Sequence, residues 1–301
     1  MSIATAHSVF HRFCREFTLA MFDQWIALPT GDDLAKVMQV YDDLGFPGAM
    51  GSCDVTHLAW GCAPHSHPRS STGKAEFPTL AYQAIVTHSG KVVGVTKGFP
   101  GSKRDKAIIR YDRNVQRIRE SAVYTNVSYN LRNEDDAEVE HTGAYLIADG
   151  GYHKWKSLMS PTKAPLEQDE IEWCTMLAGV HKDVECFFGN LKGRFRILKL
   201  PIMYHKREDI DNMFFTCCIL HNMLHTYDGL DVLEANVDWA GVDGRHNPWE
   251  RNPMEDAGNL CFLEAPGEKV EVEAEHAKLK RNLITHFAYR ARHETLHSLK
   301  L

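Results

Sequence analysis

The chain has 301 residues, a formal net charge of −6, and 44% hydrophobic and 25% charged residues, values that are ordinary for a globular protein. No window reaches 18 uncharged apolar residues, which excludes a transmembrane helix, and charges within the first 28 residues exclude a signal peptide. The net charge argues against a uniformly basic nucleic-acid-binding protein. The charge is segregated, however: the stretch 192–207 holds six basic residues and no acid.

The first part of the chain predicts two helices followed by a strand. Apolar residues recur at helical spacing from Val9 to Trp25, and Pro29 follows the expected end of that helix. A second helix is expected over Asp32–Asp43. A segment rich in glycine and proline then leads into a strand at about Ala49–Ala59.

The next segment predicts a hairpin and a helix. Two β-rich runs, Leu80–Thr87 and Val92–Thr96, are joined at Ser89-Gly90, which is a compact hairpin signal. The run Ser102–Asp105 has the pattern of a capping box, and it predicts a helix of roughly fifteen residues. The polar and acidic stretch Asn126–His141 is expected to form an inserted loop.

The second half predicts one more strand and then mainly helices. Ala144–Ala148 is a short apolar strand, and helical patterns cover Glu167–Arg194 and about Glu208–Thr226. Beyond Asp228 the chain is rich in glycine, asparagine, proline and acid, which favours an extended or partly disordered tail. A terminal helix at about Glu271–His297 is expected to dock back through three apolar residues, Leu279, Leu283 and Phe287.

The order of these elements predicts an α/β fold. A strand, a hairpin, a helix, another strand and further helices indicate a mixed sheet flanked by helices. Antiparallel pairing comes first, and a parallel strand arrives through the helical crossover.

Three acids stand out because of their positions. Asp54 lies inside an apolar strand, where a lone carboxylate is costly to bury. Asp149 ends another apolar strand and precedes two glycines, and Glu185 lies beside the apolar stripe of a helix. Such acids can converge at a sheet edge and bind hard, oxygen-preferring cations. Position alone favours simpler interpretations for two of them, a turn at Asp149 and an exposed helical residue at Glu185.

Five short motifs follow one another along the chain. They are Gly51-x-x-Asp54-x-Thr56-His57, Pro100-Gly101-Ser102-x-x-Asp105, Asp149-x-Gly151-Tyr152, Lys182-Asp183-Val184-Glu185-x-x-Phe188-Gly189-x-Leu191-Lys192-x-Arg194-Phe195 and Leu220-His221-Asn222-Met223. In this order, over roughly residues 45–226, the chain resembles the PIF/Harbinger superfamily of transposases, especially its plant-type members. Thirty-five residues separate Asp149 from Glu185, a spacing typical of acid-triad recombinases.

The resemblance implies an RNase H-like nuclease domain over residues 45–228. Residues 1–44 are then a helical remnant of a DNA-binding region, and residues 229–301 are the acidic tail with its terminal helix. It also implies that Asp54, Asp149 and Glu185 form a catalytic triad that binds two Mg²⁺ or Mn²⁺ ions. Two such ions generate a nucleophile at neutral pH and stabilise the leaving oxyanion in DNA hydrolysis, and strand transfer would reuse the same site.

Other residues are expected to assist or to bind DNA. The expected phosphate contacts are Lys182, Lys192, Arg194, Arg196 and Lys199. The alternative for the basic run is an ordinary solvated surface. His181 stands where plant-type members usually have arginine, which makes it an accessory candidate. Asp105 is a second one, although a capping role explains it sufficiently. His57 is expected to be structural, and His221-Asn222 a hydrogen-bonded core pair.

Family resemblance also sets the expected partners and location. The family pairs its nuclease with a separately encoded Myb-like DNA-binding protein, so DNA and such a protein are the expected partners. A homo-oligomer is compatible with the sequence, no membrane association is expected, and the nucleus is the expected location. Two alternatives remain: a domesticated, catalytically inactive DNA- or protein-binding module, and a different metal hydrolase on a related scaffold.

Overall fold

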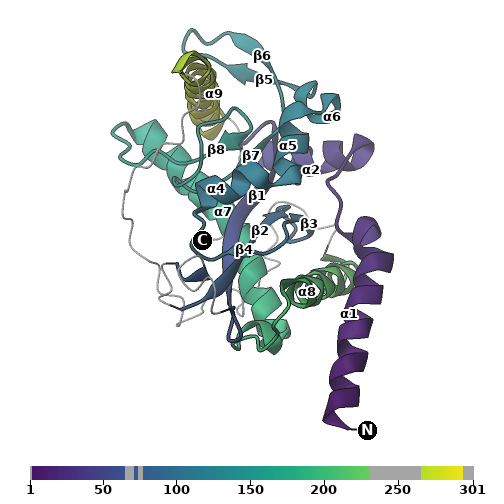
Figure 1. Cartoon of the computed structure of the whole chain (residues 1–301). Coiled ribbons are helices and arrows are strands. Elements are labelled where there is room, and N and C mark those ends of the chain that lie inside the picture. Colours follow the sequence, from purple (N-terminus) through teal and green to yellow (C-terminus); the bar gives the residue numbers. More distant parts are fainter. Residues whose placement is uncertain (1, 65–70, 74–76, 231–265, 294–301) are drawn as a thin grey trace.

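A mixed sheet lies at the centre of the computed structural model, which describes residues 2–64, 71–73, 77–230 and 266–293 (Figure 1). The strand order is β3-β2-β1-β7-β8. β1 (Ala49–Ala59) is the central strand of that path, with β2 (Thr79–Val86) antiparallel on one side and β7 (Tyr145–Ile147) parallel on the other. The predicted fold class, a mixed sheet flanked by helices, is confirmed.

The outer strands follow the expected topology. β3 (Val92–Val95) and the short β4 (Phe99–Pro100) both pair antiparallel with β2, while β8 (Leu158–Met159) extends the sheet parallel to β7. Gly90 has a φ of 88° in the turn between β2 and β3, a conformation that suits glycine. The predicted hairpin, and the parallel strand that follows a helical crossover, are therefore both present.

Helices cover both faces of the sheet. Their bounds are α1 Ile3–Trp25, α2 Gly31–Asp43, α4 Asp105–Tyr111, α5 Arg113–Glu120, α6 Ala122–Thr125, α7 Gln168–Arg194, the 3₁₀ turn Arg196–Leu198, α8 Arg207–Tyr227 and α9 Pro266–His293. α4 and α5 share a core with one face, and α7 and α8 pack against the other. None of the helices in the described part of the chain has the length and hydrophobicity to cross a membrane.

The predicted capping box and its fifteen-residue helix are wrong. α4 begins at Asp105, so the N-cap residue is Arg104 rather than Ser102, and the Arg104 side chain makes no capping hydrogen bond. The helical region is interrupted at Asp112, which has an extended backbone and accepts a hydrogen bond from the amide of Asn114 at 2.8 Å. Because an aspartate that caps its own following residues competes with helix continuation, the segment divides into α4 and α5.

The predicted inserted loop at 126–141 is a two-stranded hairpin. β5 (Ser128–Arg132) pairs antiparallel with β6 (Glu138–Thr142), and Asp136 has a φ of 57° in the connecting turn. Leu131 and His141 are buried on its inner side. Only alternate positions are apolar, so the high acid content concealed the two-residue period of a half-buried strand.

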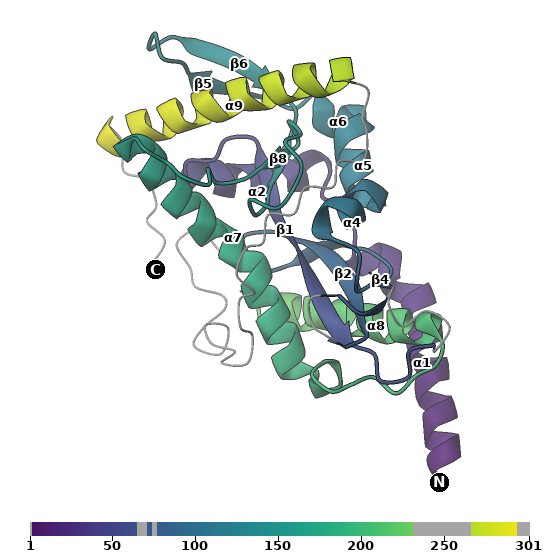
Figure 2. The ribbon, with the colours of Figure 1, turned by 60° about the vertical axis from the view of Figure 1, so that its left-hand side comes forward.

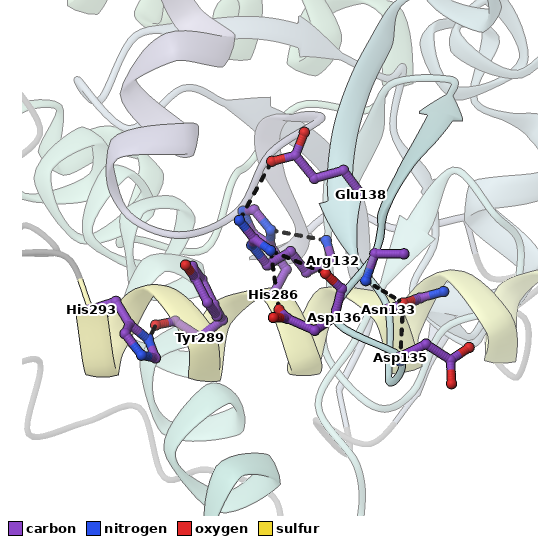
Figure 3. A network of polar contacts seen from close by, with 9 residues as sticks. Arg132, Asn133, Asp135, Asp136, Glu138, His286, Tyr289 and His293 are labelled. Carbon is purple, nitrogen blue, oxygen red and sulfur yellow. Dashed lines mark hydrogen bonds and ion pairs between the residues drawn. The ribbon is translucent and has the colours of Figure 1, made fainter.

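The terminal helix docks as predicted, with Leu279, Leu283 and Phe287 buried against the body of the protein. α9 lies across the β5–β6 hairpin (Figure 2). Arg132 joins the two elements (Figure 3): its guanidinium lies 4.0 Å from the ring centroid of Tyr289, and its backbone amide donates to Nδ1 of His286 at 3.2 Å. Most of the predicted acidic tail, residues 231–265, lies outside the described residues.

Candidate active site

Asp54 and Asp149 follow matched positions on neighbouring parallel strands. Ser52 of β1 pairs with Ile147 of β7. Asp54 and Asp149 each come two residues after this pair, so they occupy matched positions. Asp54 is half-buried in the middle of β1, whereas Asp149 is exposed just after β7. Oδ1 of Asp149 accepts a hydrogen bond from the amide of Gly151 at 2.8 Å, and this turn holds its carboxylate near the sheet edge.

Glu185 comes from α7, which packs across β1 and presents this side chain to solvent. Two buried contacts fix the helix beside it. Asp183 pairs with Nδ1 of His88 at 2.8 Å, and the hydroxyl of Ser52 donates to the carbonyl of Val180 at 3.3 Å. Sequence reasoning missed the role of Asp183, although it lies inside the quoted motif; a lone acid on the apolar side of a helix was the available signal.

His181 links the helix to the strand that carries Asp54. Its Nε2 lies 3.2 Å from the carbonyl oxygen of Cys53, and its Nδ1 lies 3.9 Å from Oε1 of Glu185. Because a carbonyl only accepts, Nε2 carries the hydrogen in this arrangement. Nδ1 attracts the Glu185 carboxylate when the ring is protonated, and the imidazole then relates one acid of the candidate triad to the strand of another.

The acids act on one another through their charges. Burial raises the pKa of Asp54 well above its usual range; a hydrogen bond from the Val55 amide opposes the shift, and repulsion from Asp149, Asp105 and Glu185 adds to it. The strongest charged neighbours of Asp54 are thus all carboxylates. Asp105, interpreted from sequence as a capping residue, lies instead in this electrostatic cluster at the start of α4.

Tyr152 is a further member of the cluster that sequence reasoning quoted but did not assign. Its side chain is buried, and its hydroxyl has no hydrogen-bond partner. Burial raises the pKa of Tyr152 well above its usual range, and the charges of Asp54, Asp105 and Asp149 raise it further. A buried phenol without a partner beside several acids has hydrogen-bonding capacity to offer a bound group.

The donor chemistry of this cluster fits a hard divalent cation, because carboxylate oxygens are the ligands that Mg²⁺ and Mn²⁺ prefer. The acidic side chains lie farther apart than the ligands of a single metal ion do. Across residues 2–64, 71–73, 77–230 and 266–293, no three His, Cys, Asp or Glu side chains stand close enough to hold one ion together. Asp149 and Glu185 are exposed, so their side chains have room to turn toward Asp54.

The predicted phosphate-binding residues extend from Lys182 in the middle of α7, through the end of this helix, to the turn after it. Lys182, Arg194, Arg196 and Lys199 are exposed, and Lys192 is half-buried. Lys192 follows Glu185 by seven residues, so the two side chains leave nearly the same side of α7 about 10 Å apart along its axis. A negatively charged strand that passes Glu185 can therefore continue along this basic surface.

Two histidine interpretations agree with the structure. His57 is exposed, and its Nδ1 lies 2.9 Å from the hydroxyl of Thr79 on β2. His221 is buried, with Nε2 3.1 Å from the carbonyl oxygen of Gly90. Asn222 receives a hydrogen bond from the amide of Val92 at 3.0 Å. The predicted core pair on α8 thus anchors the β2–β3 hairpin.

Comparison with known families agrees with the order of the motifs. The model of a family described as plant transposon protein matches residues 23–230, which is more than half of the chain. The chain belongs to this family. The predicted resemblance to PIF/Harbinger-type transposases is thereby confirmed. The match extends from the end of α1 to the end of α8, and so contains the sheet and all four acids.

Curated relatives of this plant transposon family member are distant. A protein named ALP1-like from Arabidopsis thaliana is 23% identical over 211 residues, covering 67% of this chain and 48% of that protein. The Arabidopsis thaliana protein named Antagonist of Like Heterochromatin Protein 1 is 18% identical over 215 residues, covering 71% of this chain and 52% of that protein. The chain thus spans about half the length of these relatives. No solved structure gives a significant match.

Proposed function

We propose that this protein is a transposase-derived DNA endonuclease with an RNase H-like core, in which Asp54, Asp149 and Glu185 hold two divalent metal ions. The observation that carries the proposal is the placement of the three acids. Asp54 lies on the central strand, Asp149 follows the matched position of its parallel neighbour, and Glu185 lies on the helix that packs on these strands. The charges of Asp149 and Glu185 also help to raise the pKa of Asp54, after the larger effect of burial. Family membership supports the same reaction class. Hydrolysis of a phosphodiester bond, with strand transfer as a second use of the site, is the chemistry that such a triad performs.

Each residue has a distinct part in this proposal. Asp54 is the least exposed of the three and would hold the ions from the sheet, while Asp149 and Glu185, both exposed, would supply further carboxylate ligands. Asp105 is an accessory acid, and His181 is a positioning residue for Glu185. When bound, Mg²⁺ or Mn²⁺ lowers the pKa of a coordinated water and stabilises the leaving oxygen. The basic residues from Lys182 to Lys199 would hold the DNA backbone beside the acids.

A cleavage assay tests the activity directly. The purified protein is incubated with supercoiled and linear DNA in Mg²⁺, in Mn²⁺ and in EDTA, and nicked or cut product is measured. We expect cleavage only with a divalent ion, and its loss in Asp54→Asn, Asp149→Asn and Glu185→Gln. Asp136→Asn is the matched control, because Asp136 is an exposed acid in the β5–β6 turn. Cleavage that survives all three triad substitutions would contradict the assignment.

A catalytically inactive binding module is the second candidate. It is favoured by the spacing of the acids, since no three potential ligands among the described residues form a ready metal site. One relative bears a name that describes antagonism of a heterochromatin protein, which is compatible with a role in chromatin. This candidate predicts DNA binding or protein binding by the parent protein without divalent-dependent cleavage. The expected nuclear location and a Myb-like partner are compatible with both candidates, and co-purification with such a partner tests the latter.

A further inference from the structure

α1 carries an apolar stripe that its own body covers only in part. One side of the helix packs on α8, where Thr18 donates to the carbonyl of Asn212 at 3.2 Å and Phe22 meets Phe215 edge-on. The first turns of α1 project beyond the rest of the molecule in both views (Figures 1 and 2). Along α1, Ile3 is 90% exposed and Phe13 is 48% exposed.

The exposed stripe has the spacing of a coiled-coil seam. The steps between its members are alternately three and four residues. The members are Ile3, Ala6, Phe10, Phe13, Phe17 and Ala20. This is the spacing at which one side of a helix meets a partner helix continuously. The stripe borders the face that packs on α8. Phe17 is half-buried against the core at this border, whereas Ile3, Phe10 and Phe13 are exposed. Cys14 and Thr18, the buried residues of the packed face, belong to a different row.

We propose that α1 pairs with α1 of a second copy of this chain, antiparallel and about a two-fold axis between residues 11 and 12. In that register large residues meet small ones: Ile3 faces Ala20, and Phe17 faces Ala6. Phe10 faces Phe13 at the centre, close to the axis. All three pairs have residue numbers that add to 23, so one two-fold operation matches the whole stripe with itself. Such self-complementarity is what an isologous dimer interface requires.

The contact is short, which favours a weak dimer. An overlap over residues 3–20 gives a helix pair about 27 Å long. An interface of that length belongs to the low end of specific interfaces, so the dimer dissociates on the order of micromolar concentrations. Since the stripe continues on the projecting half of α1, the bodies of the two copies lie toward opposite ends of the helix pair.

Cysteine crosslinking tests both the pairing and its direction. The double variant Ile3→Cys/Ala20→Cys places two thiols about 25 Å apart in one helix, too far for a bond within one chain. Under mild oxidation we expect a disulfide-linked dimer from the double variant, and from a mixture of the two single variants. Each single variant alone should remain uncrosslinked. Crosslinking of a single variant alone would show parallel pairing and would overturn the proposal.

Sedimentation equilibrium of the full chain measures the affinity. We expect Phe10→Glu/Phe13→Glu to weaken self-association by more than about 100-fold, because four phenylalanines leave the symmetric interface. Ser8→Glu/Leu19→Glu adds the same charge on the opposite, exposed side of α1 and should leave the association unchanged. A parent protein that stays monomeric up to about 100 μM, or a control pair that dissociates equally, would contradict the proposal. DNA or another segment of the chain on the stripe would give that monomeric outcome.

Discussion

His181 and Glu185 face each other across one turn of α7, with 3.9 Å between Nδ1 of the imidazole and Oε1 of the carboxylate. The other ring nitrogen is tied to the backbone of Cys53, the residue before Asp54. A single side chain thus relates the helix acid of the proposed triad to the strand acid. An arginine here could reach the Cys53 carbonyl and Glu185 from the two ends of its planar guanidinium, and its charge would not depend on the pH.

Replacing His181 should affect turnover more than DNA binding. In His181→Ala, Glu185 loses its orienting contact, and residues that orient metal ligands contribute roughly 10–100-fold to activity. We expect the cleavage rate to fall within that range while the DNA dissociation constant changes less than about twofold. His181→Arg should retain most of the rate, because a guanidinium donates to both the Cys53 carbonyl and Glu185. Equal losses in rate and in affinity would contradict a positioning role.

Asp54 should destabilise the metal-free protein at neutral pH. Its pKa is raised in the folded state, chiefly by burial, so the folded protein holds this proton more tightly than the unfolded chain. The contribution of Asp54 to the free energy of unfolding is therefore fully present below its unfolded pKa of 3.8. That contribution is lost as the pH rises through the folded pKa. Asp54→Asn should melt higher than the parent at pH 7 without metal, by about 2–3 °C for each kcal/mol relieved. The difference should disappear toward pH 4.

Asp54→Asn also tests whether Asp54 is a metal ligand or only a buried acid that destabilises the fold. Mn²⁺ or Mg²⁺ should raise the melting temperature of the parent protein in proportion to occupancy, and Asp54→Asn should lose most of that increase. Asp136→Asn, far along the chain in an exposed turn, serves as the control. An unchanged response of Asp54→Asn to both metals would remove Asp54 from the ligand set.

Much of the fold follows from local patterns, and its two errors have different causes: Asp112 interrupts a helix locally, whereas the β5–β6 hairpin depends on a partner distant in sequence. The limits of β1 and the docking of α9 through Leu279 were predictable because apolar periodicity reports which face of an element is buried. The β5–β6 hairpin was missed because it is covered by α9, which comes more than a hundred residues later. Partners so distant in sequence leave no mark on local periodicity.

The site shows the same division. Asp54 was recognisable because a carboxylate inside an apolar strand violates the pattern around it. The contacts that hold α7, from Ser52 to Val180 and from His88 to Asp183, join residues about 95 or more positions apart and cannot be read from spacing. Asp105 looked like a cap because its local motif is shared by capping boxes, whereas its charge acts on Asp54 only in the folded chain.

Asp112 should give the protein a second, independent pH dependence. Burial raises its pKa to about 6 from 3.8, although hydrogen bonds from Asn114 and Gln83 oppose the shift. Its contribution is therefore full below pH 4 and is lost by pH 6 to 7, with an upper limit of about 3 kcal/mol at 1.36 kcal/mol for each pKa unit. Nε2 of Gln83 donates to Asp112, while the buried Oε1 of Gln83 has no partner.

Asp112→Asn should consequently stabilise the protein above pH 6. The asparagine keeps the capping oxygen for the Asn114 amide, and a flipped Gln83 can accept from its new amide, so the hydrogen bond between the two side chains is kept. Nε2 of Gln83 then takes the place in which Oε1 has no partner in the parent protein. We expect a gain of about 1–2 kcal/mol at pH 7 and none near pH 4, measured by urea denaturation at both values. Asp112→Ala, which removes the cap, should be destabilised at both. A gain for Asp112→Asn that does not depend on pH would contradict the titration of Asp112.

The basic surface after Glu185 should bind DNA through phosphates and independently of base sequence. The test replaces four residues by glutamine: Lys192, Arg194, Arg196 and Lys199. Each lost phosphate contact should reduce the slope of log affinity against log salt by about one unit, so the full variant loses up to about four. The loss of affinity should be uniform across unrelated DNA sequences. Glu185→Gln should instead keep or tighten DNA binding, because it removes a negative charge beside the same phosphates.

A matched variant separates a specific surface from total charge. It replaces two lysines and two arginines elsewhere on the surface, all exposed: Lys36, Arg113, Arg117 and Lys163. Both variants lower the net charge equally, so a purely global effect would weaken them alike. We expect the control to keep most of the salt slope, since its charges lie on α2, on α5 and before α7 rather than beside Glu185. If the variant of the basic surface keeps both the affinity and the slope of the parent, the stretch from Lys192 to Lys199 is an ordinary solvated surface, and DNA must bind elsewhere on the protein.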